Sequence, residues 1–287
     1  MASLVEAVRE RVVVLDGGLA TELERRGNDL SSVLWSARLL RDDPEEIVAA
    51  HRAFFAAGAE VAITASYQVS FDRLGDEAEM LLRRSVDLAR RAGQGWVAAS
   101  VGPYGAMLAD GSEYRGDYGR SVDELRRFHR RRLAVLAEAG ADALAVETIP
   151  CLAEVEAVLA ELDGLGAQAW LSLSCVGERT RAGEPAGEAF AMARDCPAVF
   201  AVGVNCTAPA DVADLVAVAA ARSGKPAVAY PNSGEVWDAD RRSWSGRSAF
   251  DPASVRRWVT GGARLVGGCC RVGPADVAAI AGVVRRR

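Results

Sequence analysis

The chain has 287 residues, with 34 Lys and Arg against 39 Asp and Glu, a formal net charge of −5 and an apolar fraction of one half. This length allows a buried core without disulfide bonds, and the net acidity argues against nucleic acid or an anionic membrane as a partner. One lysine, Lys225, and two histidines, His51 and His129, are present. A histidine metal cluster is therefore excluded, and a Schiff-base mechanism would have to use Lys225.

No apolar stretch approaches the roughly 18 residues of a membrane helix. The first residues carry charges where a signal peptide needs an apolar segment. We therefore expect a cytoplasmic protein.

Short apolar runs alternate with segments of helical periodicity along the whole chain. Strands are predicted at 12–15, 61–64, 96–101, 143–147, 169–174, 199–205, 227–230 and 264–267. Helices are predicted near 45–58, 73–93, 121–140, 153–163, 184–194, 210–222, 252–262 and 275–286. Eight strand–helix units favour an α/β fold, a single (β/α)8 barrel over residues 1–287, rather than a doubly wound sheet.

The longest irregular pieces follow strand ends, at 16–44, 102–120, 175–183 and 231–250. In a barrel the carboxyl ends of all strands meet at one mouth, where the active site is built. The polar residues and thiols expected there are Asp16, Ser66, Tyr67, Tyr104, Glu147, Asn205, Cys206, Cys269 and Cys270.

Six cysteines divide into two groups. Cys151, Cys175 and Cys196 are expected to be small buried hydrophobic residues. Cys269 and Cys270 follow Gly267–Gly268, a pair that we expect to supply the backbone freedom for both thiols to face one ion. With Cys206 at the end of the sixth strand, three thiolates would leave tetrahedral Zn²⁺ one open position. Spacing alone leaves this site open, because no C-x-x-C pattern is present.

Seven segments carry a resemblance to a known family: VVLDGGLATELERRG, LWSARLL, ITASYQVS, ETIP, GVNC, YPNSGEVW and GGCCR. Together they resemble the homocysteine S-methyltransferase family from about residue 11 to residue 284. The resemblance implies that Cys206, Cys269 and Cys270 bind zinc. It also implies transfer of a methyl group to L-homocysteine, giving methionine, and YPNSGEVW is similar to the branch that uses the sulfonium donors S-methylmethionine or S-adenosylmethionine.

The other residues at the mouth suit these substrates. Asp16 and Glu147 are expected to hold the ammonium of homocysteine, and Gly17, Gly18 and Ser66 to donate to its carboxylate. Asn205 and the loop at 230–235 are expected to shape the pocket, while individual roles within 231–250 stay open. Trp35, Tyr67 and Tyr104 are candidates for cation–π contact with the donor, with packing as the alternative. His51 lies on an apolar helical stripe and is expected in the core.

Three other functions stay open at this point. The donor could be betaine or another methyl compound, or the acceptor a selenol. A barrel lyase or aldolase would use Gly267–Gly268 to bind phosphate. A zinc store or thiol redox sensor would use the three cysteines without the acids. The sequence does not distinguish a monomer from a homo-oligomer.

Overall fold

Eight parallel strands form one continuous sheet in the computed structural model, which describes residues 2–30, 36–238 and 243–286. They are β1 (Val13–Val14), β2 (Val61–Ile63), β3 (Trp96–Val101), β4 (Ala143–Ile149), β5 (Ala169–Leu173), β8 (Val199–Asn205), β9 (Ala227–Tyr230) and β12 (Ala263–Val266). β1 pairs with β12, and a parallel bridge from Leu15 to Val61 joins it to β2. The sheet is thereby closed, which confirms the predicted (β/α)8 barrel.

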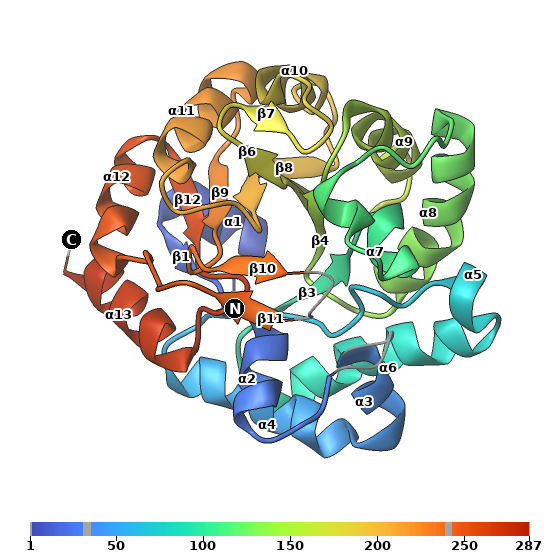
Figure 1. Cartoon of the computed structure of the whole chain (residues 1–287), viewed down its shortest axis with the longest axis horizontal. Coiled ribbons are helices and arrows are strands. Elements are labelled where there is room, and N and C mark those ends of the chain that lie inside the picture. The colour runs from blue at the N-terminus through green and yellow to red at the C-terminus, as the bar shows by residue number, and fades with distance from the viewer. Residues whose placement is uncertain (1, 31–35, 239–242, 287) are drawn as a thin grey trace.

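The helices form an outer ring around these strands (Figure 1). They are α4 (Pro44–Ala56), α6 (Glu77–Ala92), α8 (Val122–Glu138), α9 (Leu152–Leu162), α10 (Ala186–Met192), α11 (Val212–Ser223), α12 (Val255–Thr260) and α13 (Pro274–Arg285). The prediction of one helix over 73–93 is wrong. Gly75, with φ of 55°, separates α5 (Phe71–Leu74) from α6. The helix predicted over 252–262 begins with a 3-10 turn, η2 (Pro252–Ser254).

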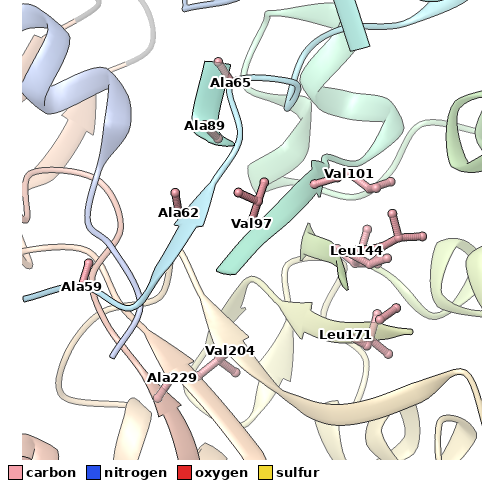
Figure 2. Packing of buried hydrophobic residues seen from close by; sticks show 14 of the residues in the cluster. Ala59, Ala62, Ala65, Ala89, Val97, Val101, Leu144, Leu171, Val204 and Ala229 are labelled. Atoms are coloured by element: carbon pink, nitrogen blue, oxygen red, sulfur yellow. The ribbon is translucent and has the colours of Figure 1, made fainter. Parts of the chain in front are cut away.

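Each strand is buried on both faces, so the protein has two hydrophobic layers. Val97 and Val101 of β3 point outward to the helices, together with Leu144 and Leu171 (Figure 2). Inside the barrel, small side chains such as Ala98 leave room for the large ring of Trp170. An additional helix, α1 (Leu4–Glu10), packs Leu4, Ala7 and Val8 against this inner layer. Alternation along each strand therefore fills both layers at once.

The segments predicted to be irregular contain short elements. They are α2 (Leu19–Arg25), α3 (Ser36–Asp42), α7 (Tyr104–Leu108), η1 (Ser112–Tyr114), the hairpin of β6 (Cys175–Val176) with β7 (Arg179–Thr180), and that of β10 (Val236–Asp238) with β11 (Ser243–Ser245). Figure 1 shows the β10–β11 hairpin in front of the strands. These elements follow strand ends, so they surround the barrel mouth. Within the described ranges, no helix has the length and apolarity needed to cross a membrane.

Candidate active site

Three thiols meet at the ends of β8 and β12. Cys206 Sγ lies 2.9 Å from Cys269 Sγ, and Cys269 Sγ lies 4.0 Å from Cys270 Sγ. All three sulfur atoms lie within 4.8 Å of one another. Hydrogen bonds from the Cys269 and Cys270 thiols lower the pKa of Cys206 well below its usual range. The three residues thus form one cluster of thiols at the barrel mouth.

The backbone around this cluster is strained. Cys206, Thr148 and Arg271 have positive φ values of 46°, 62° and 65°, and Ala109 is the only other non-glycine residue of the described chain with this conformation. Such conformations cost about 1–3 kcal/mol each and persist where the surroundings enforce them. For Cys206, Arg181 Nη2 donates to its carbonyl over 2.9 Å and Ser174 Oγ over 3.2 Å.

The glycines before Cys269 serve close packing. A Cβ on Gly268 would lie 2.1 Å from Val272 Cγ1, and one on Gly267 would lie 2.7 Å from the Asp16 carbonyl oxygen. Neither glycine has a positive φ. In this segment the residue with a positive φ is Arg271. Backbone freedom is therefore the wrong explanation of this pair. The missing side chains let the chain after β12 turn tightly against the loop after β1.

Two carboxyl groups lie at strand ends of the barrel mouth: that of Glu147 is in the pocket wall, and that of Asp16 is buried outside the lining. Glu147 Oε1 accepts from Ser100 Oγ over 2.5 Å, and burial raises the pKa of Glu147 to about 7. Asp16 Oδ2 accepts from the Ile63 amide over 2.8 Å, whereas Oδ1 is buried with no hydrogen-bond partner in the described chain. Burial also raises the pKa of Asp16, and the charge of Glu147 raises it further.

The remaining residues expected to bind homocysteine are placed differently from one another. Gly17 and Asn205 line the same pocket as Glu147. Ser66 lies outside the lining of this pocket, and its hydroxyl donates to the Ser100 carbonyl over 2.7 Å. Gly18 lines the pocket, but its amide already donates to the Val272 carbonyl over 2.9 Å.

Of the three aromatic candidates, Tyr67 lines the pocket. The Tyr104 ring lies outside the lining and packs against Phe128 and Tyr118, with centroids 5.1 and 5.5 Å away. Trp35 lies outside the described residues.

Several pocket residues were missed by the sequence analysis, among them two with titratable side chains. Glu113 and Tyr114 belong to η1, in the loop that follows β3, and both line the pocket. The guanidinium of Arg181 covers the Tyr114 ring at 5.2 Å from its centroid. A position after a strand end was the available signal, but it did not distinguish these residues from the rest of 102–120.

The described pocket wall is acidic and contains no basic residue. Its lining comprises Gly17, Gly18, Leu19, Ala20, Thr21, Ile63, Thr64, Ala65, Tyr67, Ser100, Glu113, Tyr114, Glu147, Thr148, Asn205, Cys206, Tyr230, Gly268, Cys269 and Cys270. Three thiols are soft ligands of the kind that zinc prefers, and the described pocket lining offers no cationic side chain to balance their charge as thiolates. The donor set therefore fits a zinc ion, whereas the wall does not suit a phosphate.

The other cysteines and the lysine lie away from this wall. Cys151 and Cys175 are buried and Cys196 is half-buried, and burial raises the pKa of Cys151 and of Cys175 to about 12. The Nζ atom of Lys225 donates to the carbonyls of Cys196 and Val199, before and at the start of β8. It is therefore at the opposite end of the barrel from the thiols.

Comparison with known proteins gives relatives that match almost the whole chain. The sequence profile of the family described as "Homocysteine S-methyltransferase" matches residues 13–284. A homocysteine S-methyltransferase of Bacillus subtilis is 43% identical, over 96% of this chain and 95% of the relative. The metallated crystal structure of the Escherichia coli homocysteine methyltransferase MmuM superposes with a TM-score of 0.84 at 40% identity, over 97% of each chain.

Proposed function

The chain belongs to the homocysteine S-methyltransferase family, and on that premise we propose that it uses bound Zn²⁺ to transfer a methyl group from a sulfonium donor to the thiol of L-homocysteine. S-methylmethionine or S-adenosylmethionine would be the donor and methionine the product. One observation carries the proposal: three thiols and two carboxyl groups, those of Glu147 and Glu113, meet in a pocket whose described lining has no basic residue. Such a pocket suits cations and a metal-bound thiol.

Cys206, Cys269 and Cys270 would hold the zinc ion. When bound, zinc keeps a coordinated thiol ionised at neutral pH, so the sulfur of the acceptor can act as a nucleophile. The protein's part is to gather the three sulfur atoms. The carbonyl contacts from Arg181 and Ser174 fix the strained Cys206, and the close packing at Gly268 fixes Cys269.

Glu147 would bind the ammonium of homocysteine, with the carboxyl group of Asp16 behind it. A cation next to Glu147 favours its ionised form and thus offsets the burial that raises its pKa. The Ser100 hydroxyl donates to the Glu147 carboxylate and orients it. The Ser66 hydroxyl donates to the Ser100 carbonyl and so fixes the position of Ser100. Ser66 is thus proposed to act indirectly, and Gly17 stays the backbone candidate for the substrate carboxylate.

Methyl transfer from a sulfonium requires no acid or base from the protein. The acceptor sulfur supplies the electron pair of the new S–C bond, and the donor sulfur keeps the pair of the broken bond and leaves as a neutral thioether. Tyr67 is proposed to face the donor, and Tyr114 takes the place given to Tyr104, whose ring packs elsewhere. Trp35 stays a proposed cation–π contact of the donor.

The test incubates zinc-loaded protein with homocysteine and each donor in turn, and measures methionine. We expect S-methylmethionine to be used best, S-adenosylmethionine more slowly and betaine not at all. Betaine turnover at a comparable rate would refute the sulfonium assignment. Selenocysteine offered as the acceptor tests the remaining alternative, since a selenocysteine Se-methyltransferase of Brassica oleracea is 41% identical over 97% of this chain.

A further inference from the structure

A second carboxyl group in the pocket wall, that of Glu113, forms no ion pair within the described chain. The residue is 4% exposed, and its Oε2 atom is buried without a hydrogen-bond partner in the described chain. Burying an ionised carboxylate is costly unless a donor or a cation faces it. The position of Glu113 in the pocket wall indicates that the missing partner is a ligand.

The nearest arginine in sequence does not supply this partner. Arg115 Nη2 lies 3.7 Å from Asp110 Oδ2, and its Nε lies 3.6 Å from Asp117 Oδ1. Its side chain is 53% exposed, so it faces solvent rather than the pocket. The structure gives Glu113 no ion pair with any residue in the described ranges. The carboxylate is therefore left for a cation that enters the pocket.

The backbone of Glu113 is rigidly placed. A Cβ on Gly105 of α7 would lie 2.5 Å from the Glu113 nitrogen, so α7 and η1 pack backbone to backbone at this point. On the other side, Asp110 Oδ1 accepts from the Ser112 amide over 2.9 Å. Tyr114, the next residue, is covered by the Arg181 guanidinium. A backbone fixed in this way limits the positions open to the Glu113 side chain, which preorganises it to bind a ligand in the pocket.

Glu113 and Glu147 are held in the pocket wall by different elements. Glu147 lies on β4, with its carboxylate fixed by Ser100 inside the barrel. Glu113 lies on the loop beyond β3, next to Tyr114. The reaction brings together two cations, the ammonium of homocysteine and the charged donor. Each carboxylate can therefore serve one of them, with the inner one serving the amino acid whose thiol is activated.

We propose that Glu113 binds the positively charged sulfonium of the methyl donor, an inference that rests on the proposed function. The sulfonium charge is full in the bound donor and disappears as the S–CH₃ bond breaks, so Glu113 stabilises the ground state more than the transition state. The contact therefore increases donor affinity without accelerating transfer. It also weakens once the thioether has formed, which favours release of the spent donor.

The experiment compares Glu113→Gln with Glu147→Gln, two isosteric changes that each remove one charge. Calorimetry without homocysteine measures the Kd of zinc-loaded protein for S-methylmethionine and for trimethylsulfonium, which has no amino group. Glu113→Gln should weaken both by about tenfold or more, which corresponds to about 1.4 kcal/mol. It should raise the donor KM without lowering kcat, and leave the homocysteine KM and the zinc content unchanged. Glu147→Gln should instead raise the homocysteine KM.

Three results would overturn the inference: unchanged trimethylsulfonium affinity in Glu113→Gln, loss of zinc, or a parallel rise in both KM values. Weaker binding of S-methylmethionine alone would assign Glu113 to the donor's ammonium and also overturn it. Glu113→Asp, which keeps the charge, should give an intermediate affinity and guards against a misfolded glutamine variant. If the unmodified protein makes no methionine from any sulfonium, the proposed function fails, whereas trimethylsulfonium binding still tests Glu113.

Discussion

The side-chain amide of Asn205 holds the backbone of Thr148 in a left-handed conformation. Asn205 Oδ1 accepts from the Thr148 amide over 2.7 Å, and its Nδ2 donates to Thr148 Oγ1 over 2.7 Å. Ser172 Oγ donates to the same Oδ1 atom over 2.8 Å. Because Thr148 follows Glu147 directly and Asn205 precedes Cys206, this contact ties the proposed ammonium site to the thiol cluster.

Replacing Asn205 by Ala should uncouple the two parts of the pocket. Loss of the buried hydrogen bonds should lower the free energy of unfolding by about 2–3 kcal/mol. The homocysteine KM should rise as well, because Glu147 loses its fixed backbone. Denaturant unfolding and steady-state kinetics measure the two effects. Thr148→Gly, which relieves the positive φ, should cost less in the Asn205→Ala background than alone. Additive effects would show that Asn205 does not hold Thr148.

Serine at any one of Cys206, Cys269 or Cys270 should remove zinc and activity. The hydroxyl of serine is not an adequate substitute for a thiolate ligand. The barrel should stay folded, because its two hydrophobic layers do not include a closed metal site. Metal analysis and circular dichroism measure the two outcomes, with Cys196→Ser as the matched control. Full zinc content in all three variants would refute the assignment.

Alanine at Gly268 should displace Cys269, because its Cβ would lie 2.1 Å from Val272 Cγ1. We expect zinc affinity to fall at least about tenfold, as measured by competition with a chelator. Gly273→Ala is the matched control, since no heavy atom lies within 4 Å of a Cβ at that position. Equal zinc affinity in the two variants would contradict the packing argument.

His51 should make the protein less stable in mild acid. The residue is fully buried in α4, neither ring nitrogen has a partner in the described chain, and burial lowers its pKa from 6.5 to about 4. The folded state thus keeps His51 neutral. As the pH falls below 6.5, the unfolded chain binds a proton that the folded chain does not, and stability is lost progressively down to pH 4.

At pH 5 this loss amounts to about 2 kcal/mol relative to pH 8. His51→Leu should therefore flatten the pH dependence of the unfolding free energy by that amount, as measured by denaturant titration at both pH values. Stability that falls equally with pH in the variant and in the parent would assign the acid sensitivity to other groups.

The strands were predictable because their apolar character is local: each is a short run that must be buried on both faces. The break in the helix at Gly75 was not predictable, because helical periodicity continues across it. The helix is interrupted by the positive φ of that glycine. Barrel topology brings strand ends together, which made Cys206, Cys269 and Cys270 candidates for one site, and the resemblance to the family implied them as the ligand set.

The positions of loop side chains depend on contacts between distant segments, and these left no local pattern. Ser66 lies at a strand end as expected, yet its hydroxyl donates to Ser100 on the neighbouring strand. Glu113 enters the pocket because Gly105 permits a close backbone contact. Tyr104 turns away to pack on Phe128 of α8. Each outcome is set by a residue in another element.

The seam between β1 and β12 gives the chain a definite order of maturation. The Arg271 amide donates to Thr21 Oγ1 over 2.9 Å across 250 positions of sequence, beside the contact of Gly18 with Val272. Synthesis starts at the amino end of the chain. β1 therefore has no β12 to pair with until nearly all of the protein has been made. The thiol cluster is likewise incomplete until Cys269 and Cys270 have been added to the chain that already contains Cys206. Metal capture at the proposed site would therefore be one of the last events in biosynthesis, because a chain released before residue 269 has one of the three thiols.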